Sequence, residues 1–279
     1  MTQISVSADQ LVAQRYRDPA PAPAPAPAPE WNPVLRVLHE HRSIRRYLAD
    51  PVPDAILRLL VSAAQSAPTS SNLQAWSVIA VRDPERKARL ATLAGDQDHI
   101  RQAPVLLVWT ADLARLRALA AERGAPLDGA DYLESSYVAF LDAALAAQNA
   151  VTAAESLGLG TVYIGAIRNN PEQVAAELSL PPGVFAVVGL VVGTPDPSED
   201  ARVKPRLPQA AVLHEETYDA TGLGAHLAEY ETRIAEFYAE QNLEHSWIDR
   251  VLTRLGSAAA LKGRDRLRDQ LAAQGFPLR

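Results

Sequence analysis

The chain has 279 residues, of which 48% are hydrophobic, and a formal net charge of −6 at pH 7. An acidic chain of this kind lacks the dense positive surface that general nucleic-acid binding needs, which excludes nucleic acid as a partner. The sequence contains no cysteine, and this excludes disulfides, zinc–thiolate sites, iron–sulfur clusters and thiol nucleophiles.

Residues 1–30 are predicted to form an N-terminal arm. Residues 1–17 lack the long apolar centre of a signal peptide. Residues 19–29 alternate proline and alanine, so they suit neither a helix nor a central strand and predict an extended tether of roughly 30 Å. Because such a tether contributes little core, removal of residues 1–29 is expected to leave the melting temperature nearly unchanged.

From residue 31 onward, helices and strands alternate. Apolar residues at helical spacing, with proline or capping residues in several first turns, predict helices at 32–41, 53–67, 84–93, 131–157, 171–178, 225–241 and 247–274. Short runs rich in β-branched residues predict strands at 77–81, 105–111, 161–164 and 185–192. About four strands carry the whole chain, which favours an α+β fold with an antiparallel or mixed sheet over a doubly wound one.

The longest predicted helix, 131–157, is apolar almost all round and is therefore expected to be buried on most faces. Its most apolar part is interrupted by Asp142 and two amides, so it is interpreted as a buried helix rather than a membrane span. Gly158 and Gly160 follow this helix and precede a strand, the reverse of a dinucleotide-binding loop, and they indicate a helix stop. We expect a soluble cytoplasmic protein that binds neither nucleic acid nor membrane.

Three separated clusters carry polar chemistry. The first, residues 41–46 (HRSIRR), offers cationic donors and a hydroxyl that could hold a phosphate, although for this cluster taken alone a solvated basic stretch is the better interpretation. The second, residues 67–76 (APTSSNLQAW), offers donors and acceptors to a heteroaromatic ring, or is a loop that bonds its own backbone. The third, residues 163–170 (YIGAIRNN), places Gly165 and Ala166 at a strand end, where a flat ligand could approach the backbone.

Together and in this order, the segments HRSIRRY, SAPTSSNLQAWS, GDQDHI, AQNAVTAAESLGLGTVYIGAIRNN and KPRLP resemble the flavin-dependent nitroreductase superfamily. The similarity is to its NADPH-preferring nitroreductase/flavin reductase branch, and it runs from about residue 31 to the C-terminus. It implies one nitroreductase-like FMN-binding domain over 31–279, with a helical excursion at 219–279 that wraps the partner subunit. It also implies an obligate intertwined homodimer, with the helix from residue 131 in the interface.

The resemblance implies non-covalent FMN and assigns residues to it. Removal of residues 1–29 is expected to leave the FMN content nearly unchanged as well. The phosphate ligands would be His41, Ser43, Arg45, Lys204 and Arg206. Contacts to the ring or ribityl group would come from Thr69, Ser70, Ser71, Gln97, Ile164, Gly165 and Ala166. The acceptor and nicotinamide side would be bordered by Ser71, Arg168, Asn169 and Arg264.

The resemblance also implies a ping-pong reaction, in which NADPH or NADH reduces the flavin and then a nitroaromatic, quinone or similar electron-poor small molecule is reduced. The flavin carries this chemistry, so no catalytic side chain and no metal is expected. Residues 239–244 depart from the branch, because an acidic loop stands where a basic loop often receives the 2′-phosphate of NADPH. Lys262, Arg264 and Arg266 remain candidates for that phosphate, or form a solvated helix face.

Three other functions stay open. The protein could be a flavin reductase that supplies reduced FMN, which a comparison of acceptors would reveal. It could be a catalytically weak flavin-binding protein, which would not consume NAD(P)H. It could also be an α+β adaptor whose proline arm recruits partners, which would be colourless when purified.

Overall fold

A computed structural model describes residues 8–17 and 31–279, so the tether predicted at 19–29 lies outside the described residues. The chain divides into two compact units. The first unit comprises the described residues up to 42 together with residues 201–260, and the second unit comprises residues 43–200 and 261–279. Among the described residues, no helix combines the length and the apolar composition that crossing a bilayer requires.

The second unit is built on a four-stranded sheet. Its strands are β1 (Trp76–Val81), β2 (Val105–Asp112), β3 (Gly160–Ile164) and β4 (Val184–Gly193), in the order β1-β2-β4-β3. Every neighbouring pair is antiparallel. The predicted α+β class and all four predicted strands are therefore confirmed.

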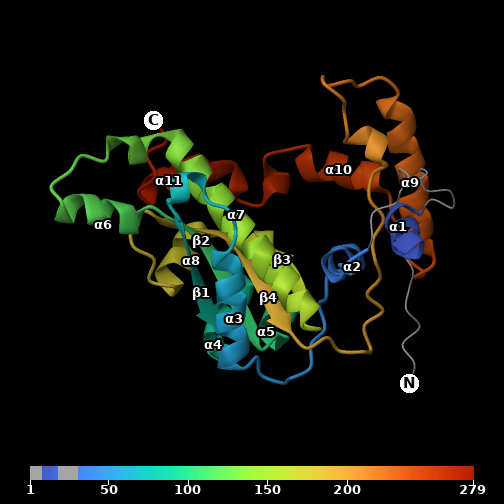
Figure 1. The fold of residues 1–279 in the computed structure, drawn as a ribbon, viewed down its shortest axis with the longest axis horizontal. Coiled ribbons are helices and arrows are strands. Elements are labelled where there is room, and N and C mark those ends of the chain that lie inside the picture. The colour runs from blue at the N-terminus through green and yellow to red at the C-terminus, as the bar shows by residue number, and fades with distance from the viewer. Residues whose placement is uncertain (1–7, 18–30) are drawn as a thin grey trace. The chain divides into compact units, whose positions relative to one another are not determined.

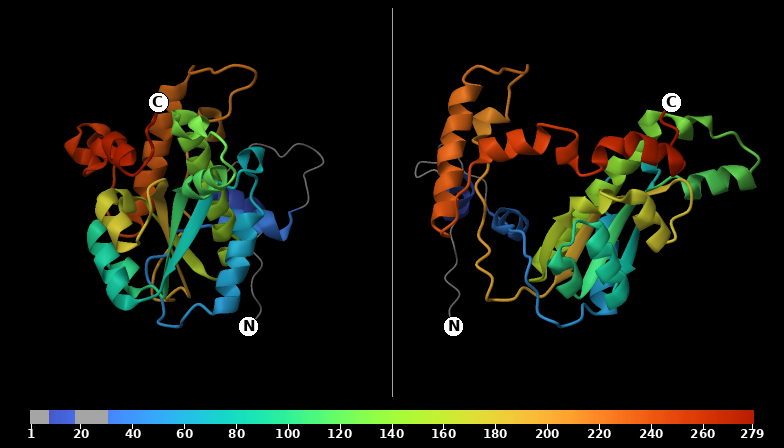
Figure 2. Two further views of the ribbon diagram at one scale, coloured as in Figure 1. Left: turned by 90° about the vertical axis from the view of Figure 1, so that its left-hand side faces the viewer. Right: turned by 180° about the vertical axis from the view of Figure 1, so that it is seen from behind.

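Helices cover both faces of this sheet (Figures 1 and 2). On one face lie α3 (Asp54–Gln65) and α7 (Leu133–Ser156), and on the other lie α4 (Pro84–Leu93), α5 (Asp98–Gln102) and α8 (Pro171–Glu177). The second unit also contains α6 (Ala114–Glu122) and α11 (Leu267–Ala273).

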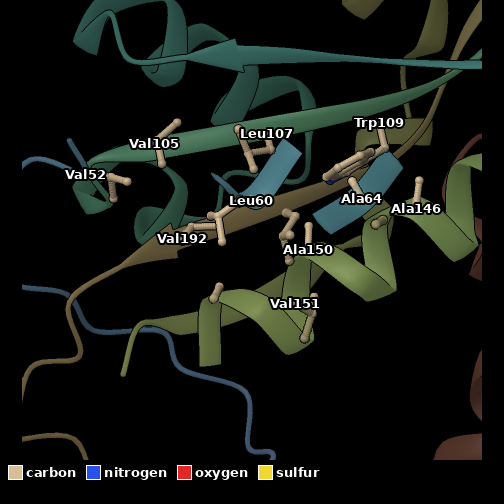
Figure 3. Close-up of a cluster of buried hydrophobic side chains, with 13 residues drawn as sticks. Val52, Leu60, Ala64, Val105, Leu107, Trp109, Ala146, Ala150, Val151 and Val192 are labelled. Carbon is tan, nitrogen blue, oxygen red and sulfur yellow. The ribbon is translucent and has the colours of Figure 1, made fainter. Parts of the chain in front are cut away.

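The main core lies between the sheet and the helices α3 and α7 (Figure 3). Alternate residues of β2 point into it, including Leu107 and Trp109, because successive side chains of a strand face opposite sides. Leu60 of α3 is 1% exposed there. On α7, small residues such as Ala146 and Ala150 are fully buried and allow this helix to approach both α3 and the sheet closely.

The first unit is helical. It contains α1 (Ala8–Tyr16), α2 (Pro33–Glu40), α9 (Leu223–Ala239) and α10 (Trp247–Leu255). As predicted, α2 begins after the capping residue Asn32, whose Oδ1 accepts a hydrogen bond from the Leu35 amide at 3.1 Å. Tyr230, Ile234 and Phe237 of α9 form the unit's apolar cluster.

One sequence prediction needs correction, and some helices were missed. The single helix predicted at 247–274 is wrong, since α10 ends at Leu255 and short 3-10 turns at Ala259–Leu261 and Arg264–Arg266 separate it from α11. Gly263 has φ +84°, a conformation that interrupts a right-handed helix. Three helices were not predicted at all: α1, α5 and α6.

Candidate functional site

A buried carboxylate holds the hydroxyl-rich loop at residues 69–75. Asp142 of α7 is 2% exposed. Its Oδ2 accepts hydrogen bonds from the Thr69 hydroxyl at 2.6 Å and the Ala75 amide at 3.1 Å, and its Oδ1 accepts one from the Ser70 amide at 3.2 Å. Three donors from one loop therefore compensate a single buried charge. In the sequence, this aspartate is visible only as an interruption of an apolar helix.

The tip of the same loop is strained. Ser71, Asn72 and Gln74 have φ values of +49°, +55° and +50°, in the left-handed region that non-glycine residues avoid. The Gln74 amide donates to the Thr69 hydroxyl oxygen at 2.9 Å, which helps to hold the tip in place. The side chains of Ser70 and Ser71 are exposed. Strain of this kind concentrates at ligand-binding loops, and the flavin contacts of these serines stay a prediction.

Residues 164–168, at the end of β3, are held in place by buried side chains and a hydrogen bond to the neighbouring strand. Ile164 and Ile167 are 2% and 0% exposed. Arg168 donates to the carbonyl of Val187 on the neighbouring strand β4. Between them, Gly165 has open space, since a methyl group there would have as its nearest neighbour Arg168 Nη2 at 3.7 Å. The backbone at Gly165 and Ala166 is therefore positioned by its flanks while offering little side-chain bulk of its own.

Three segments far apart in the sequence meet at Asn169. A methyl group at Gly95 would lie 3.5 Å from Asn169 Nδ2 and 4.0 Å from Ala166 Cβ. A methyl group at Gly263 would lie 2.9 Å from the Asn169 carbonyl oxygen. Gly95 is two residues from the predicted ligand Gln97, and Gly263 precedes the predicted Arg264. The structure thus brings together three of the segments to which the flavin and acceptor contacts were assigned.

This meeting point contains an unsatisfied polar atom. Asn169 is 9% exposed, and its Oδ1 is buried without a hydrogen-bond partner among the described residues. An unpaired buried acceptor costs free energy unless a ligand or water satisfies it. Gln97, by contrast, uses its side-chain amide to donate to the Ala94 carbonyl at 2.7 Å. His99 is half-buried, and this burial lowers its pKa and so favours the neutral ring.

One half of the predicted phosphate site lies in the second unit. Ser43 forms an isolated parallel bridge with Thr161 at the edge of the sheet. The amide of Arg45 donates to both Glu199 carboxylate oxygens at 3.1 and 2.9 Å, and the amide of Arg46 donates to one of them at 2.7 Å. The side chains of both arginines are exposed. This segment therefore already binds one anionic group through its backbone.

The other half lies in the first unit. It consists of His41, which caps the end of α2, and the segment that contains Lys204 and Arg206. Arg206 Nη1 donates to the carbonyls of Lys204 and Pro205 at 3.0 and 3.3 Å, and Lys204 Nζ lies 5.2 Å from the ring centroid of Tyr238. The five predicted phosphate ligands fall in two units, so their assembly into one site stays a prediction.

Comparison with known proteins places the chain in a family. The "Nitroreductase family" matches residues 38–97 and 91–194, and the "Nitroreductase family, C-terminal domain" matches residues 204–279. The chain belongs to the nitroreductase family.

Individual relatives agree. The "FMN reductase [NAD(P)H]" of Bacillus subtilis (strain 168) is 44% identical over 208 residues, which is 74% of this chain and 83% of the relative. The "FMN reductase (NADPH)" of the same organism is 38% identical over 253 residues, 88% of this chain and 98% of the relative. The solved structure of NfrA2 from B. megaterium has a TM-score of 0.84 at 40% identity and covers 89% of this chain and 100% of its own.

Every residue predicted for the site falls within the segments that match the nitroreductase family, and helix α1 falls outside them.

The acidic loop at 239–244 is partly neutralised by basic residues of the first unit. Glu240 accepts two hydrogen bonds from Arg17 at 2.8 and 2.5 Å and lies 3.5 Å from Arg202, and the bonds from Arg17 lower the pKa of Glu240. A cavity of about 800 Å³ in the first unit is lined by α1, residues 40 and 42, residues 201–203 and Phe237, and none of the predicted site residues lines it.

Proposed function

We propose that this member of the nitroreductase family is an FMN-dependent NAD(P)H oxidoreductase that reduces nitroaromatic, quinone or similar electron-poor small molecules. The observation that carries the proposal is that three segments distant in sequence meet at Asn169. These are segments to which the flavin and acceptor contacts were assigned from the sequence. The names of the relatives support the cofactor and the electron donor.

The chemistry of the donor set fits FMN. Exposed serines at residues 70 and 71 offer hydroxyls to the polar edge of a flavin, and Gly165 leaves room for the flat ring to approach the backbone. Basic residues at 41, 45, 204 and 206 match the charge of the phosphate. When bound, FMN supplies the transfer of electrons from the nicotinamide to the acceptor.

The chain's own residues bind and orient. Asp142 fixes the backbone of the loop that carries Ser70 and Ser71, so the loop is held in place by the chain's own contacts. Arg168 fixes the strand end behind Gly165 through the Val187 carbonyl. Asn169 offers an unpaired carbonyl oxygen that a donor group of a ligand would satisfy. None of these residues is assigned a proton or electron of the reaction.

We further propose that the protein is a homodimer, because α7 exposes a stripe of large apolar residues. Leu133, Tyr137, Leu141 and Leu145 are 52%, 61%, 53% and 43% exposed, and they follow one another at four-residue spacing along one side of the helix. A contiguous exposed apolar surface of this kind marks an interface. The opposite side of α7 is already buried in the core of its own unit.

The dimer is tested by sedimentation with Leu141→Glu. A buried charge in the stripe should give a monomer that has lost FMN, whereas Leu119→Glu on α6, at 53% exposure, should stay dimeric and yellow. A wild-type monomer that retains stoichiometric FMN would contradict the shared site.

The cofactor site is tested by placing a side chain where the ring should lie. A Cβ at Gly165 would be in ordinary contact with Arg168 Nη2 alone, at 3.7 Å, so Gly165→Leu is the test variant. Gly129→Leu is its matched control, because a methyl group at Gly129 meets nothing within 4 Å. The wild type should be yellow and should bleach with NAD(P)H under nitrogen. Gly165→Leu should fold but lose FMN, and Gly129→Leu should keep it. A colourless wild type that cannot be reconstituted with FMN would overturn the proposed function.

A second candidate is a flavin reductase that supplies reduced FMN, and the names of two relatives favour it. Its site would be nearly the same, so turnover decides. Steady-state NAD(P)H oxidation with free FMN, a nitroaromatic and a quinone as alternative acceptors ranks the two functions by their kcat/KM. A yellow protein that oxidises no NAD(P)H with any of them would instead be a flavin-binding protein.

A further inference from the structure

Helix α1 is docked in the first unit, although it lies outside the segments that match the family. Leu11 and Arg15, one turn apart on the same side of the helix, are 2% and 9% exposed. At the end of the helix, Arg233 donates to the Tyr16 carbonyl at 2.9 Å, and Arg17 makes the paired contact with Glu240. An apolar residue, a buried cation and an ion pair therefore hold α1 in place.

The guanidinium of Arg15 joins two separate segments of the first unit. Its Nη1 donates to the Lys204 carbonyl at 3.1 Å, and its Nη2 donates to the carbonyls of His39 and His41 at 2.9 and 3.1 Å. His39 is in the last turn of α2, where carbonyls lack partners within the helix and a cation is favourable. A planar group with five donors suits this role better than an ammonium.

The backbone of α1 also contacts the segment at residues 204–206. The carbonyl of Arg15, near the end of α1, accepts a hydrogen bond from the amide of Arg206 at 2.9 Å. Residues 204 and 206 are therefore held on either side of Pro205, one through its carbonyl and the other through its amide. The segments that Arg15 joins are those that carry His41, Lys204 and Arg206.

We propose that α1 is a built-in positioning element of the cofactor site, and that Arg15 holds the His41 and Lys204–Arg206 segments in the arrangement that receives the FMN phosphate. The inference rests on the proposed function. Arg15 itself is a positioning residue, since its guanidinium is used by three backbone carbonyls. Without it, the two segments would have to be ordered when FMN binds, and this ordering lowers affinity.

The test compares FMN with riboflavin, which has the same ring and ribityl chain but no phosphate. Flavin fluorescence titrations of the deflavinated full-length protein give both dissociation constants. Arg15→Ala should raise the Kd for FMN about 10-fold, which corresponds to about 1.4 kcal/mol, and should leave the Kd for riboflavin unchanged. Arg15→Lys, which keeps the charge but not the fork, should restore part of the loss. Removal of residues 1–17 should reproduce Arg15→Ala.

Arg250→Ala is the control, because it removes an exposed cation of α10 in the same unit that takes no part in holding α1 or the phosphate segments. It should keep the wild-type preference for FMN over riboflavin. Equal losses of FMN and riboflavin affinity in Arg15→Ala and Arg15→Lys would overturn the inference, because Arg15 would then support the fold in general. Unchanged FMN affinity in Arg15→Ala would overturn it as well, while leaving the proposed function intact. A wild type that binds neither flavin would overturn both.

Discussion

Asp142 offers the sharpest test of how the fold shapes the site. We predict that Asp142→Asn, which preserves the shape of the side chain, will loosen the loop at residues 69–75. The asparagine oxygen can keep the position of Oδ2 and its bonds from Thr69 and Ala75. Its NH₂ group then faces the amide of Ser70, so two donors meet and one hydrogen bond is lost.

The magnitude follows from these contacts. A hydrogen bond to a charged group contributes about 1.5–3 kcal/mol, and a neutral one contributes about 1 kcal/mol. Losing one bond and neutralising two should lower the free energy of unfolding by about 2–4 kcal/mol. The three left-handed residues at the loop tip are disfavoured by about 1–2 kcal/mol each. With weaker restraint, the tip should relax and the exposed Ser71 should leave its position.

The assay is a pair of measurements on the same protein, namely urea unfolding and FMN titration. We expect a lower midpoint and an FMN affinity that falls at least about 10-fold. Glu134→Gln removes a carboxylate from an exposed position on the same helix and should change neither. If Asp142→Asn binds FMN as the wild type does, the loop does not contact the flavin and the role given to Ser70 and Ser71 is wrong.

Three further predictions concern the phosphate, pH and the core. Arg45→Ala and Arg206→Ala should each weaken FMN about 10- to 100-fold in a fluorescence titration, whereas Arg46→Ala, its equally exposed neighbour, should not; three alike variants would refute the phosphate site. Burial lowers the pKa of His99 below its ordinary 6.5, so near that pH the unfolded chain binds a proton that the folded chain does not. The free energy of unfolding should therefore fall as the pH drops below about 6.5, and it should fall less in His99→Gln. Leu60→Ala should lower the free energy of unfolding by about 2–5 kcal/mol in urea, and a smaller loss would mean that the core refills the cavity.

Most elements could be predicted because their patterns are local. The helix at Pro84–Leu93 was predicted with both boundaries correct, since Asp83 caps it and Pro84 opens it. Runs of β-branched residues predict the strands of the sheet. Gly158, with φ +78°, ends the longest helix as expected. Helix α6 has no such signal, since none of its residues is buried and its apolar residues follow no single face.

Helix α1 shows the limit of the same reasoning. The long alternation of proline and alanine that follows it favours an extended arm over residues 1–30, and on that basis removal of residues 1–29 would leave the FMN content and the melting temperature nearly unchanged. The helix is stabilised by partners near residues 40, 204 and 240, which its own nine residues do not reveal. A short helix is marginal by itself and depends on tertiary contacts. We therefore now expect that removal to reduce FMN affinity.

In the site, the residues that face a ligand could be predicted from the sequence, whereas the residues that hold them in place could not. Sequence motifs predict the residues that could face a ligand, because arginines suit the phosphate of a flavin and hydroxyls and small residues suit its ring. They did not reveal Asp142 or Arg15, whose polar atoms face the protein's own loop and carbonyls. A charged residue becomes buried only where donors or acceptors surround it, and those partners come from segments distant in sequence. One local signal was present for Asp142: a carboxylate in the middle of an alanine-rich helix must either reach solvent or find donors. Such interruptions of apolar helices are therefore the positions at which a sequence, read alone, can point to the residues that hold a site in place.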